Sequence, residues 1–231
     1  MNPAPASSPV SQRCVALAVL LLFTVPALGC DSLYYKTMRK FGVEKRDLLV
    51  KHVRETRKSQ EETKEQFQTA LERFRTVIEV DGGKLEDKYE TLNRELERSE
   101  SRARDLHDHI KDVKDVSEDL FKEWRKELDQ YSDRALRAAS ERELADTRRR
   151  AEAMIAAMER AERMVDPVLR PLRDRVLFLK HNLNALAIGA LSKELVQVRG
   201  NVDSLVKELE KSIAEADTFI KEMMAADAAA P

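Results

Sequence analysis

Between Leu85 and Val113 the chain reads LEDKYETLNRELERSESRARDLHDHIKDV, and this stretch decides the fold. Its apolar and small residues recur in alternating steps of four and three, at Leu85, Tyr89, Leu92, Leu96, Ser99, Ala103, Leu106, Ile110 and Val113. Such steps place the side chains on one face of an α-helix, as in the heptad seam of a coiled coil. The seam extends through Leu120, Trp124, Leu128 and Tyr131. The stretch therefore predicts a long helix that packs along one face.

Two further seams follow the first along the chain. One comprises Ala151, Met154, Met158, Ala161, Val165, Val168, Leu172, Val176, Leu179, Leu183 and Leu186. The other comprises Leu191, Leu195, Val198, Val202, Leu205, Leu209, Ile213, Ala216, Ile220 and Met223. An earlier helix is less regular, with apolar groups at Leu48–Val53 and Phe67–Ile78. The stretch 54–66 between these groups has no apolar side chain, so we expect it to be solvated on most faces.

Short breaks separate the seams. Asp81-Gly82-Gly83 is a turn signal, Tyr131-Ser132-Asp133 offers a helix stop followed by an N-cap, and a third break lies at Ile188-Gly189-Ala190. Such short connections make neighbouring helices antiparallel. We therefore predict an all-α protein, an elongated antiparallel helical bundle or coiled coil of about four long helices, spanning residues 43–224.

Two points of the helix plan stay open. A helix that continues through residues 131–133 is an alternative to the break. Asp166-Pro167 could start a new helix, with the aspartate as cap and the proline in the first turn. Because the seam continues through Pro167 and Pro171, we favour a single kinked helix there.

The composition supports long helices and excludes other classes. The 231 residues include 36% charged and 5% aromatic residues, with only 6 Gly and 7 Pro. Sheets need more turns than so few Gly and Pro can supply. The 42% hydrophobic content is too high for a disordered chain. Charge combined with Ala, Leu, Glu, Lys and Arg is typical of long helices and coiled coils.

The first thirty residues have a different character. Arg13 precedes the apolar run CVALAVLLLFTV from Cys14 to Val25, and small residues follow. This order of features predicts a signal peptide over residues 1–29. A permanent membrane anchor is the alternative, but the run is shorter than the roughly 20 apolar residues that span a bilayer.

The end of this segment, Ala27-Leu28-Gly29-Cys30, resembles the lipobox of bacterial lipoproteins, although Ala27 and Leu28 stand in swapped order. The resemblance implies that Cys30 is lipid-modified and becomes the mature N-terminus. Ordinary signal-peptidase cleavage after Gly29 is the alternative. Cys14 and Cys30 are the two cysteines, so removal of the signal leaves Cys30 without a disulfide partner within the chain. We therefore favour Cys30 as a lipid-attachment site.

The segment after Cys30 is basic. Residues 30–42 are interpreted as the lipid-anchor and juxtamembrane segment, and residues 36–58 contain nine basic and three acidic side chains, a net charge of +6. Anionic lipid headgroups attract such a stretch, although a solvated helix face is an equal alternative. Asp31 favours retention in the inner membrane by resemblance to enterobacterial sorting.

Three patterns that could have indicated chemistry fail on their spacing. Asp81-Gly82-Gly83-Lys84 lacks the glycine and the Ser or Thr of a phosphate loop. His107 and His109 lie two residues apart, so they face different sides of a helix and do not predict a metal site. The cluster Glu61, Glu62 and Glu65 is expected in a solvated acidic face. We expect no enzyme activity, no cofactor and no metal.

The chain also resembles a known family. The residues that carry the likeness are Leu33-Tyr34-Tyr35, Met38, 45–50, Ala70-Leu71, Asp81-Gly82-Gly83, 120–124, 127–132 and 176–185. These stretches resemble the bacterial domain-of-unknown-function family 2959, and the likeness covers essentially all of residues 30–224. The resemblance implies helical, lipoprotein-like envelope proteins, and it adds no mechanism. A DNA-repair ATPase label carried by some members conflicts with the missing phosphate loop.

The predicted topology brings one set of polar residues to the end of the bundle away from the lipid. We interpret Asp81, Gly82, Gly83, Lys180, His181, Asn182 and Asn184 as a partner-docking tip. The alternative is that the His and Asn side chains only cap helix ends and satisfy polar contacts within the bundle.

The sequence thus predicts a lipid-anchored envelope protein that faces the periplasm and has a structural or adaptor role. Its partners would be the membrane, a protein at the tip and, as a further option, a second copy of the chain. The mature chain is nearly neutral, so no nucleic acid is expected. The alternative is a cytosolic coiled-coil module of a nucleic-acid-associated, repair-type assembly, supported by eleven Arg against eight acidic residues in 134–175. Residues 225–231 are expected to form a disordered tail.

Overall fold

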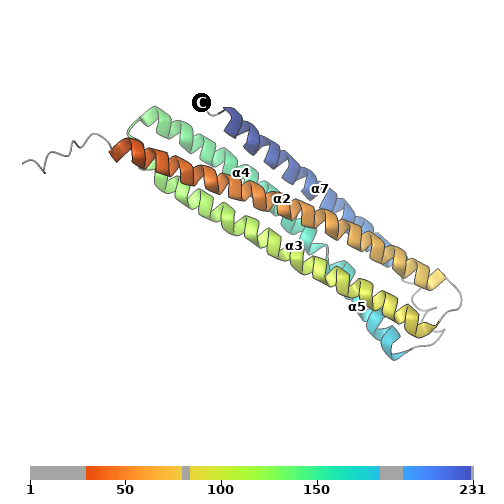
Figure 1. Ribbon diagram of the computed structural model, residues 1–231. Coiled ribbons are helices and arrows are strands. Elements are labelled where there is room, and N and C mark those ends of the chain that lie inside the picture. Colours follow the sequence, from red (N-terminus) through yellow and green to blue (C-terminus); the bar gives the residue numbers. More distant parts are fainter. Residues whose placement is uncertain (1–29, 80–83, 183–194, 230–231) are drawn as a thin grey trace, which may run out of the picture. The chain divides into compact units, whose positions relative to one another are not determined.

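The computed structural model describes residues 30–79, 84–182 and 195–229. Within these residues the chain is helical and contains no strand (Figure 1). The helices are α2 (Cys30–Glu79), α3 (Leu85–Leu128), α4 (Arg134–Arg163), α5 (Asp166–His181) and α7 (Leu195–Ala229). The all-α prediction is confirmed.

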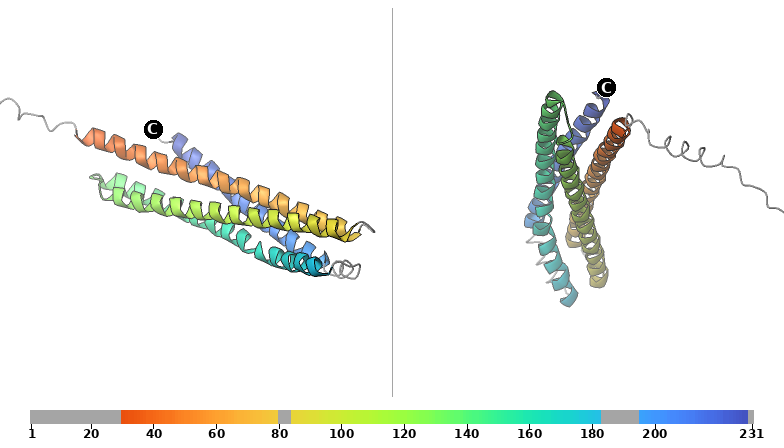
Figure 2. Two further views of the ribbon diagram at one scale, coloured as in Figure 1. Left: turned by 60° about the horizontal axis from the view of Figure 1, so that its bottom comes forward. Right: turned by 90° about the vertical axis from the view of Figure 1, so that its left-hand side faces the viewer.

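Four helical arms form the bundle, with α4 and α5 together making one arm (Figures 1 and 2). Contacts between α2 and α3 run from Lys45–Glu123 to Gln66–Glu95, so residue numbers rise along one helix as they fall along the other. Contacts between α2 and α7 show the same antiparallel order. The arm of α4 and α5 packs against α3 on one side and α7 on the other.

This bundle belongs to the compact unit of residues 42–231, and residues 1–41 form a separate unit. Of that separate unit the structure describes only the helical backbone of residues 30–41. The first turns of α2 therefore extend upstream of residue 43, where we predicted that the bundle begins.

The predicted seams form the core. Leu106, Ile110 and Val113 of α3 are at most 2% exposed, and Met154, Met158, Val168 and Leu179 of the next arm are equally buried. On α7, Val202, Leu205 and Leu209 are at most 1% exposed. Burial of these apolar side chains is the main favourable contribution to the stability of the bundle.

The break between the first two seams is confirmed. Asp133 caps α4, because its Oδ1 accepts hydrogen bonds from the backbone N–H groups of Ala135 at 2.7 Å and Leu136 at 3.2 Å. This side chain satisfies two of the N–H groups that have no partner within the helix. Our extension of the first seam to Tyr131 is wrong, because α3 ends at Leu128 and Tyr131 is 40% exposed.

The observed chain agrees better with the predicted kink at Pro167 than with a new helix that begins there with Asp166 as its N-cap. Met164 and Val165 separate α4 from α5 but keep right-handed helical torsions. Asp166 is not the N-cap residue, and its carboxylate instead accepts a hydrogen bond from Arg170. Proline removes a helical N–H and its ring crowds the preceding turn, so a local interruption or kink of the helix is expected at this point.

At the C-terminus, α7 extends to Ala229. Helix therefore continues into the segment 225–231 that we predicted to be a disordered tail.

Candidate functional site

The middle of α2 forms a polar layer in the core, which we define as Thr56, Ser59, Gln60 and Thr63. These four side chains are between 0% and 4% exposed. Their spacing of three and four residues continues the face formed by the apolar groups on either side of them. The expectation that residues 54–66 are solvated on most faces is therefore wrong. We had counted only apolar side chains, and here polar side chains occupy the buried face.

Hydrogen bonds from this polar layer connect α2 to both neighbouring helices. The Thr56 hydroxyl lies 2.9 Å from the carbonyl oxygen of His52 and 3.1 Å from that of His109 on α3. The Gln60 side-chain amide donates from Nε2 to Ser212 Oγ on α7 at 2.6 Å. A buried polar group is tolerated when such partners replace its lost water.

Gln60 is only partly satisfied. Its Oε1 atom is buried and has no hydrogen-bond donor among the described residues. An unpaired buried acceptor costs about 1–3 kcal/mol. The polar layer therefore costs stability at this point, and its best-attested use in helical bundles is to select one register of the helices.

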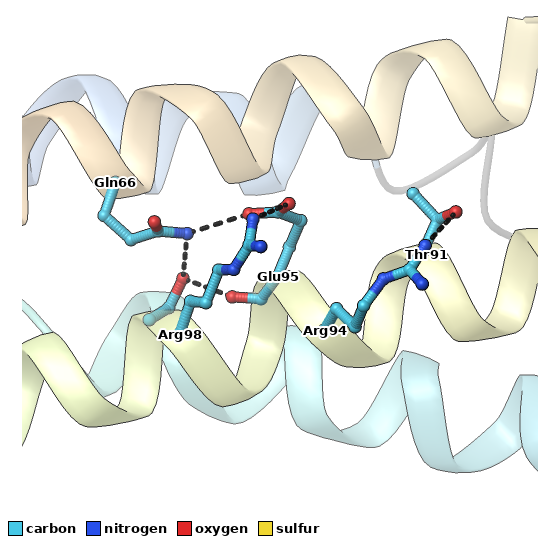
Figure 3. Close-up of polar contacts among 6 residues, drawn as sticks. Gln66, Thr91, Arg94, Glu95 and Arg98 are labelled. Atoms are coloured by element: carbon cyan, nitrogen blue, oxygen red, sulfur yellow. Dashed lines mark hydrogen bonds and ion pairs between the residues drawn. The ribbon is translucent and has the colours of Figure 1, made fainter.

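One helical turn further along α2, a second polar group joins α2 to α3 (Figure 3). Gln66 donates from Nε2 to Glu95 Oε2 at 3.0 Å, and Arg98 donates to the other carboxylate oxygen at 3.1 Å. Glu95 is 7% exposed as a residue. Each oxygen of this nearly buried carboxylate therefore has a hydrogen-bond donor that replaces water. Ser99 lies beside this pair and donates to the Glu95 backbone carbonyl at 2.8 Å.

A third polar cluster lies on the other side of the polar layer, where Lys45 and Arg46 of α2 meet α3. Trp124 of α3 is at its centre. The Arg46 guanidinium lies 4.4 Å from the centre of the Trp124 ring, and Trp124 Nε1 donates to Ser140 Oγ on α4 at 2.9 Å. Lys45 pairs with Glu123 at 2.6 Å. Burial and the neighbouring charge of Glu123 raise the pKa of Glu127 above its ordinary value, and Arg46 and Lys45 partly oppose this effect. The cluster joins α2, α3 and α4.

Ion pairs between helices account for many of the charges on the bundle. Their nitrogen–oxygen distances are 2.6 Å in Arg57–Asp217, Lys114–Glu159, His107–Glu162 and Arg173–Glu100, and 2.7 Å in Arg102–Glu62. The hydrogen bond and charge of Glu159 raise the pKa of Lys114. Each such pair contributes at most about 1 kcal/mol at a solvent-exposed position, so their main effect is on alignment.

Two of the residue patterns that we rejected as chemical sites, the glutamate cluster and the histidine pair, contribute residues to these contacts. Glu62 pairs with Arg102, and Glu61 pairs with Lys64 at 2.6 Å. His107 pairs with Glu162, and the carbonyl of His109 accepts the Thr56 hydroxyl. Within residues 45–79, 84–182 and 195–226, whose side chains are described, no group of three His, Cys, Asp or Glu could hold a metal ion.

Two surface grooves run along α3. One, of about 350 Å³, lies between α3 and α5 with Ala103 and Leu169 in its wall. The other, of about 470 Å³, lies between α3 and α4 beside Phe121 and Ile155. Basic and acidic side chains alternate around both grooves, so neither has the charge of one sign that would indicate a class of ligand.

Of the predicted docking tip, the structure describes Lys180, His181 and Asn182. Lys180 and His181 are exposed in the last turn of α5. Asn182 ends this helix, because its Nδ2 donates to the carbonyl of Phe178 at 3.0 Å. Asp81, Gly82, Gly83 and Asn184 lie outside the described residues. The capping contact agrees with the alternative reading of Asn182, whereas docking at the other two residues stays a prediction.

Exposed apolar side chains that were not predicted from the sequence lie beside the tip. Leu177 and Phe178 are 53% and 43% exposed, immediately before Lys180 and His181. Both residues fall between the seam positions Val176 and Leu179, and this offset is the signal that could have placed them on the surface.

Cys30 is the first residue of α2, and its side chain lies outside the described part of the structure. Lipid attachment at this residue stays a prediction. Among the described helices, none is long and apolar enough to cross a membrane.

Comparison with known protein families gives a match. The sequence model of the family described as protein of unknown function (DUF2959) matches residues 34–223. Among the curated proteins and among the solved structures, nothing matches the chain.

Proposed function

The chain belongs to the DUF2959 family, and from this premise we propose that it is a lipid-anchored envelope protein whose helical bundle faces the periplasm. The observation that carries the proposal is the N-terminal order Arg13, the apolar run to Val25 and Ala27-Leu28-Gly29-Cys30. A basic residue, a short apolar core and small residues are what signal processing requires. Lipid attached to Cys30 would then hold the mature chain on a membrane.

The bundle supports a structural or adaptor role without catalysis. Many of its charged side chains pair with one another, both within a helix and across helices, as in Arg57–Asp217 and Lys114–Glu159. The buried polar side chains of Thr56 and Gln60 bond to neighbouring helices. These contacts fix the alignment of long helices, which suits a rod that holds other components at a set distance from a membrane.

A protein partner would bind at the exposed tip residues Lys180 and His181. The exposed Leu177 and Phe178 beside them add the apolar area that a protein interface needs. Substitution of Lys180 and His181 with alanine should reduce crosslinking to that partner. A matched control replaces the exposed Lys111 and the half-buried His109 of α3. Equal crosslinking yields in all variants would remove the tip from the proposal.

The nucleic-acid alternative loses support from the arginine contacts. Six of the eleven arginines in 134–175 pair with carboxylates: Arg137, Arg148, Arg149, Arg150, Arg170 and Arg173. Arginines that are already paired are poorly placed to neutralise phosphates, which is the main source of affinity for nucleic acid.

The two cysteines allow a matched test of the anchor. Cys30→Ser should abolish lipid attachment and move the protein from the membrane fraction to the soluble fraction. Cys14→Ser, which changes the predicted signal peptide, should leave the attached lipid and the membrane fraction unchanged. If both variants partition in the same way as the original chain, the lipid anchor at Cys30 is wrong.

A further inference from the structure

Exposed apolar side chains lie at both ends of the bundle, and we name one of these ends the α3–α4 end. We define it by Leu48, Tyr131 and Leu136, which are 40%, 40% and 58% exposed. They come from α2, the α3–α4 connection and α4. Large apolar side chains on a protein surface are normally scattered singly, so a group of them is informative.

Side-chain contacts show that these segments share one end. Arg46 on α2 contacts the ring of Trp124 on α3, and Trp124 donates to Ser140 on α4. The α3–α4 connection and the C-terminal part of α7 also lie at the same end in Figures 1 and 2.

Unpaired cations accompany these apolar side chains. Lys126 and Arg134 are exposed on either side of Tyr131 and have no carboxylate partner among the described residues. Two of the nearby acids are already engaged, because Asp133 caps α4 and Asp129 pairs with Arg137 at 3.2 Å. Free cations beside Tyr and Leu match the requirements of an anionic lipid surface, where apolar groups insert and basic groups meet phosphates.

The length of the chain after Cys30 favours this end over the other. Fifteen residues separate Cys30 from Lys45, which pairs with Glu123 at this end. In any conformation, fifteen residues span at most about 50 Å. The opposite end lies another 34 residues along α2, which is about 50 Å of helix. A lipid on Cys30 would therefore keep the α3–α4 end within reach of the bilayer.

We propose that the α3–α4 end contacts an anionic phospholipid bilayer. Tyr131 and Leu136 enter the headgroup region, and Lys126 and Arg134 face lipid phosphates. This inference rests on the proposed function, because the lipid on Cys30 supplies the local concentration. It adds an orientation to that function, in which the bundle stands with one defined end on the membrane.

Site-directed nitroxide labels on the full chain test this orientation. Leu136→Cys and Phe178→Cys are made separately, labelled, and reconstituted into vesicles of phosphatidylglycerol and phosphatidylethanolamine. Phe178 is the matched control, because it is an exposed apolar residue at the opposite end. Collision rates with oxygen and with a water-soluble nickel chelate are measured, and circular dichroism checks that each variant is helical.

The proposal predicts an oxygen-to-nickel collision ratio several-fold higher at position 136 than at position 178. It also predicts that the ratio at 136 falls when Lys126→Gln and Arg134→Gln are added or when the vesicles contain only phosphatidylcholine. Equal ratios at 136 and 178 would overturn the proposal. Low collision rates with both reagents at 136 would also overturn it, because they indicate burial against protein.

Mass spectrometry of Cys30 in the same preparation distinguishes the lipid anchor at Cys30 from the membrane contact of the α3–α4 end. An acylated Cys30 with an aqueous position 136 leaves the anchor and removes the membrane contact. An unmodified Cys30 with position 136 in lipid removes the anchor and leaves the contact. An unmodified Cys30 with an aqueous position 136 removes both.

Discussion

Asn201 on α7 donates a hydrogen bond from Nδ2 to the carbonyl oxygen of Pro167 on α5, at 3.1 Å. This bond replaces a missing helical hydrogen bond. In a regular helix the carbonyl of Pro167 would accept from the N–H of residue 171, but Pro171 has no N–H. A side chain from a neighbouring arm thus supplies the donor. The contact explains how the kinked arm tolerates two prolines and stays packed on α7.

A double-mutant cycle tests this compensation. Asn201→Ala should lower the free energy of unfolding by about 0.5–1.5 kcal/mol, since one hydrogen bond is lost. In a Pro171→Ala background the helical N–H is restored, so the same substitution should cost clearly less. Urea unfolding followed by circular dichroism measures both values. An equal cost of Asn201→Ala in the two backgrounds would contradict the compensation.

The polar layer should reduce stability while it selects a register. Gln60→Ala should lower the free energy of unfolding by about 2–3 kcal/mol, because it leaves a cavity and an unpaired Ser212. Gln60→Leu combined with Ser212→Ala should be neutral or stabilising, since it also removes the unpaired Oε1 atom. The exposed Gln68→Ala on the same helix is the control and should change stability by less than about 0.5 kcal/mol.

The same double substitution should weaken the specificity of assembly. An apolar layer can pack in more than one register or with a second chain, which the Gln60–Ser212 hydrogen bond disfavours. Analytical ultracentrifugation of the double variant should therefore show additional oligomers. A double variant that is strongly destabilised, or that has the oligomeric state of the original chain, would count against the register role.

Glu127 should give the bundle a pH-dependent penalty. Its pKa is raised in the folded state, so folding takes up a proton at pH values between the ordinary glutamate pKa and the raised one. The penalty is therefore present in full above the raised pKa, at neutral pH, and disappears as pH falls below the ordinary value near 4.3. Glu127→Gln should raise the melting temperature at pH 7, and the difference should vanish at acidic pH. The exposed Glu90→Gln should show neither effect.

The Trp124 cluster should hold the α3–α4 end together. Trp124→Phe keeps an aromatic ring beside Arg46 but removes the hydrogen bond to Ser140 Oγ. We expect a loss of about 1 kcal/mol in the free energy of unfolding. Ser140→Ala should cost a similar amount, and the two substitutions together should cost little more than either alone. Fully additive costs in thermal unfolding would contradict the cross-helix bond.

The seams made most of the fold predictable from sequence. Apolar side chains at Leu106, Ile110, Met158 and Leu205 follow the helical repeat, and burial of that repeat drives the packing. Local signals also worked, because Asp133 caps α4 through bonds to residues only two and three positions away. Signals within a few residues of their effect can be recognised in one sequence.

The buried polar contacts were not predictable in this way. Gln60 and Ser212 lie 152 residues apart, and Thr56 bonds to a carbonyl 53 residues away. Nothing near Gln60 in the chain indicates that a partner will replace its water. The same is true of Asn201, whose partner is a backbone carbonyl set free by a proline in another helix. The exposed Tyr131 and Leu136 became meaningful only when the fold placed them at one end with Leu48.

The most direct test of the proposed function is intact-mass and N-terminal peptide mass spectrometry of the protein purified from membranes. The proposal predicts a chain that begins at Cys30 and has the added mass of acyl chains on that residue. A chain that begins at Met1, or at Cys30 without added mass, would contradict it.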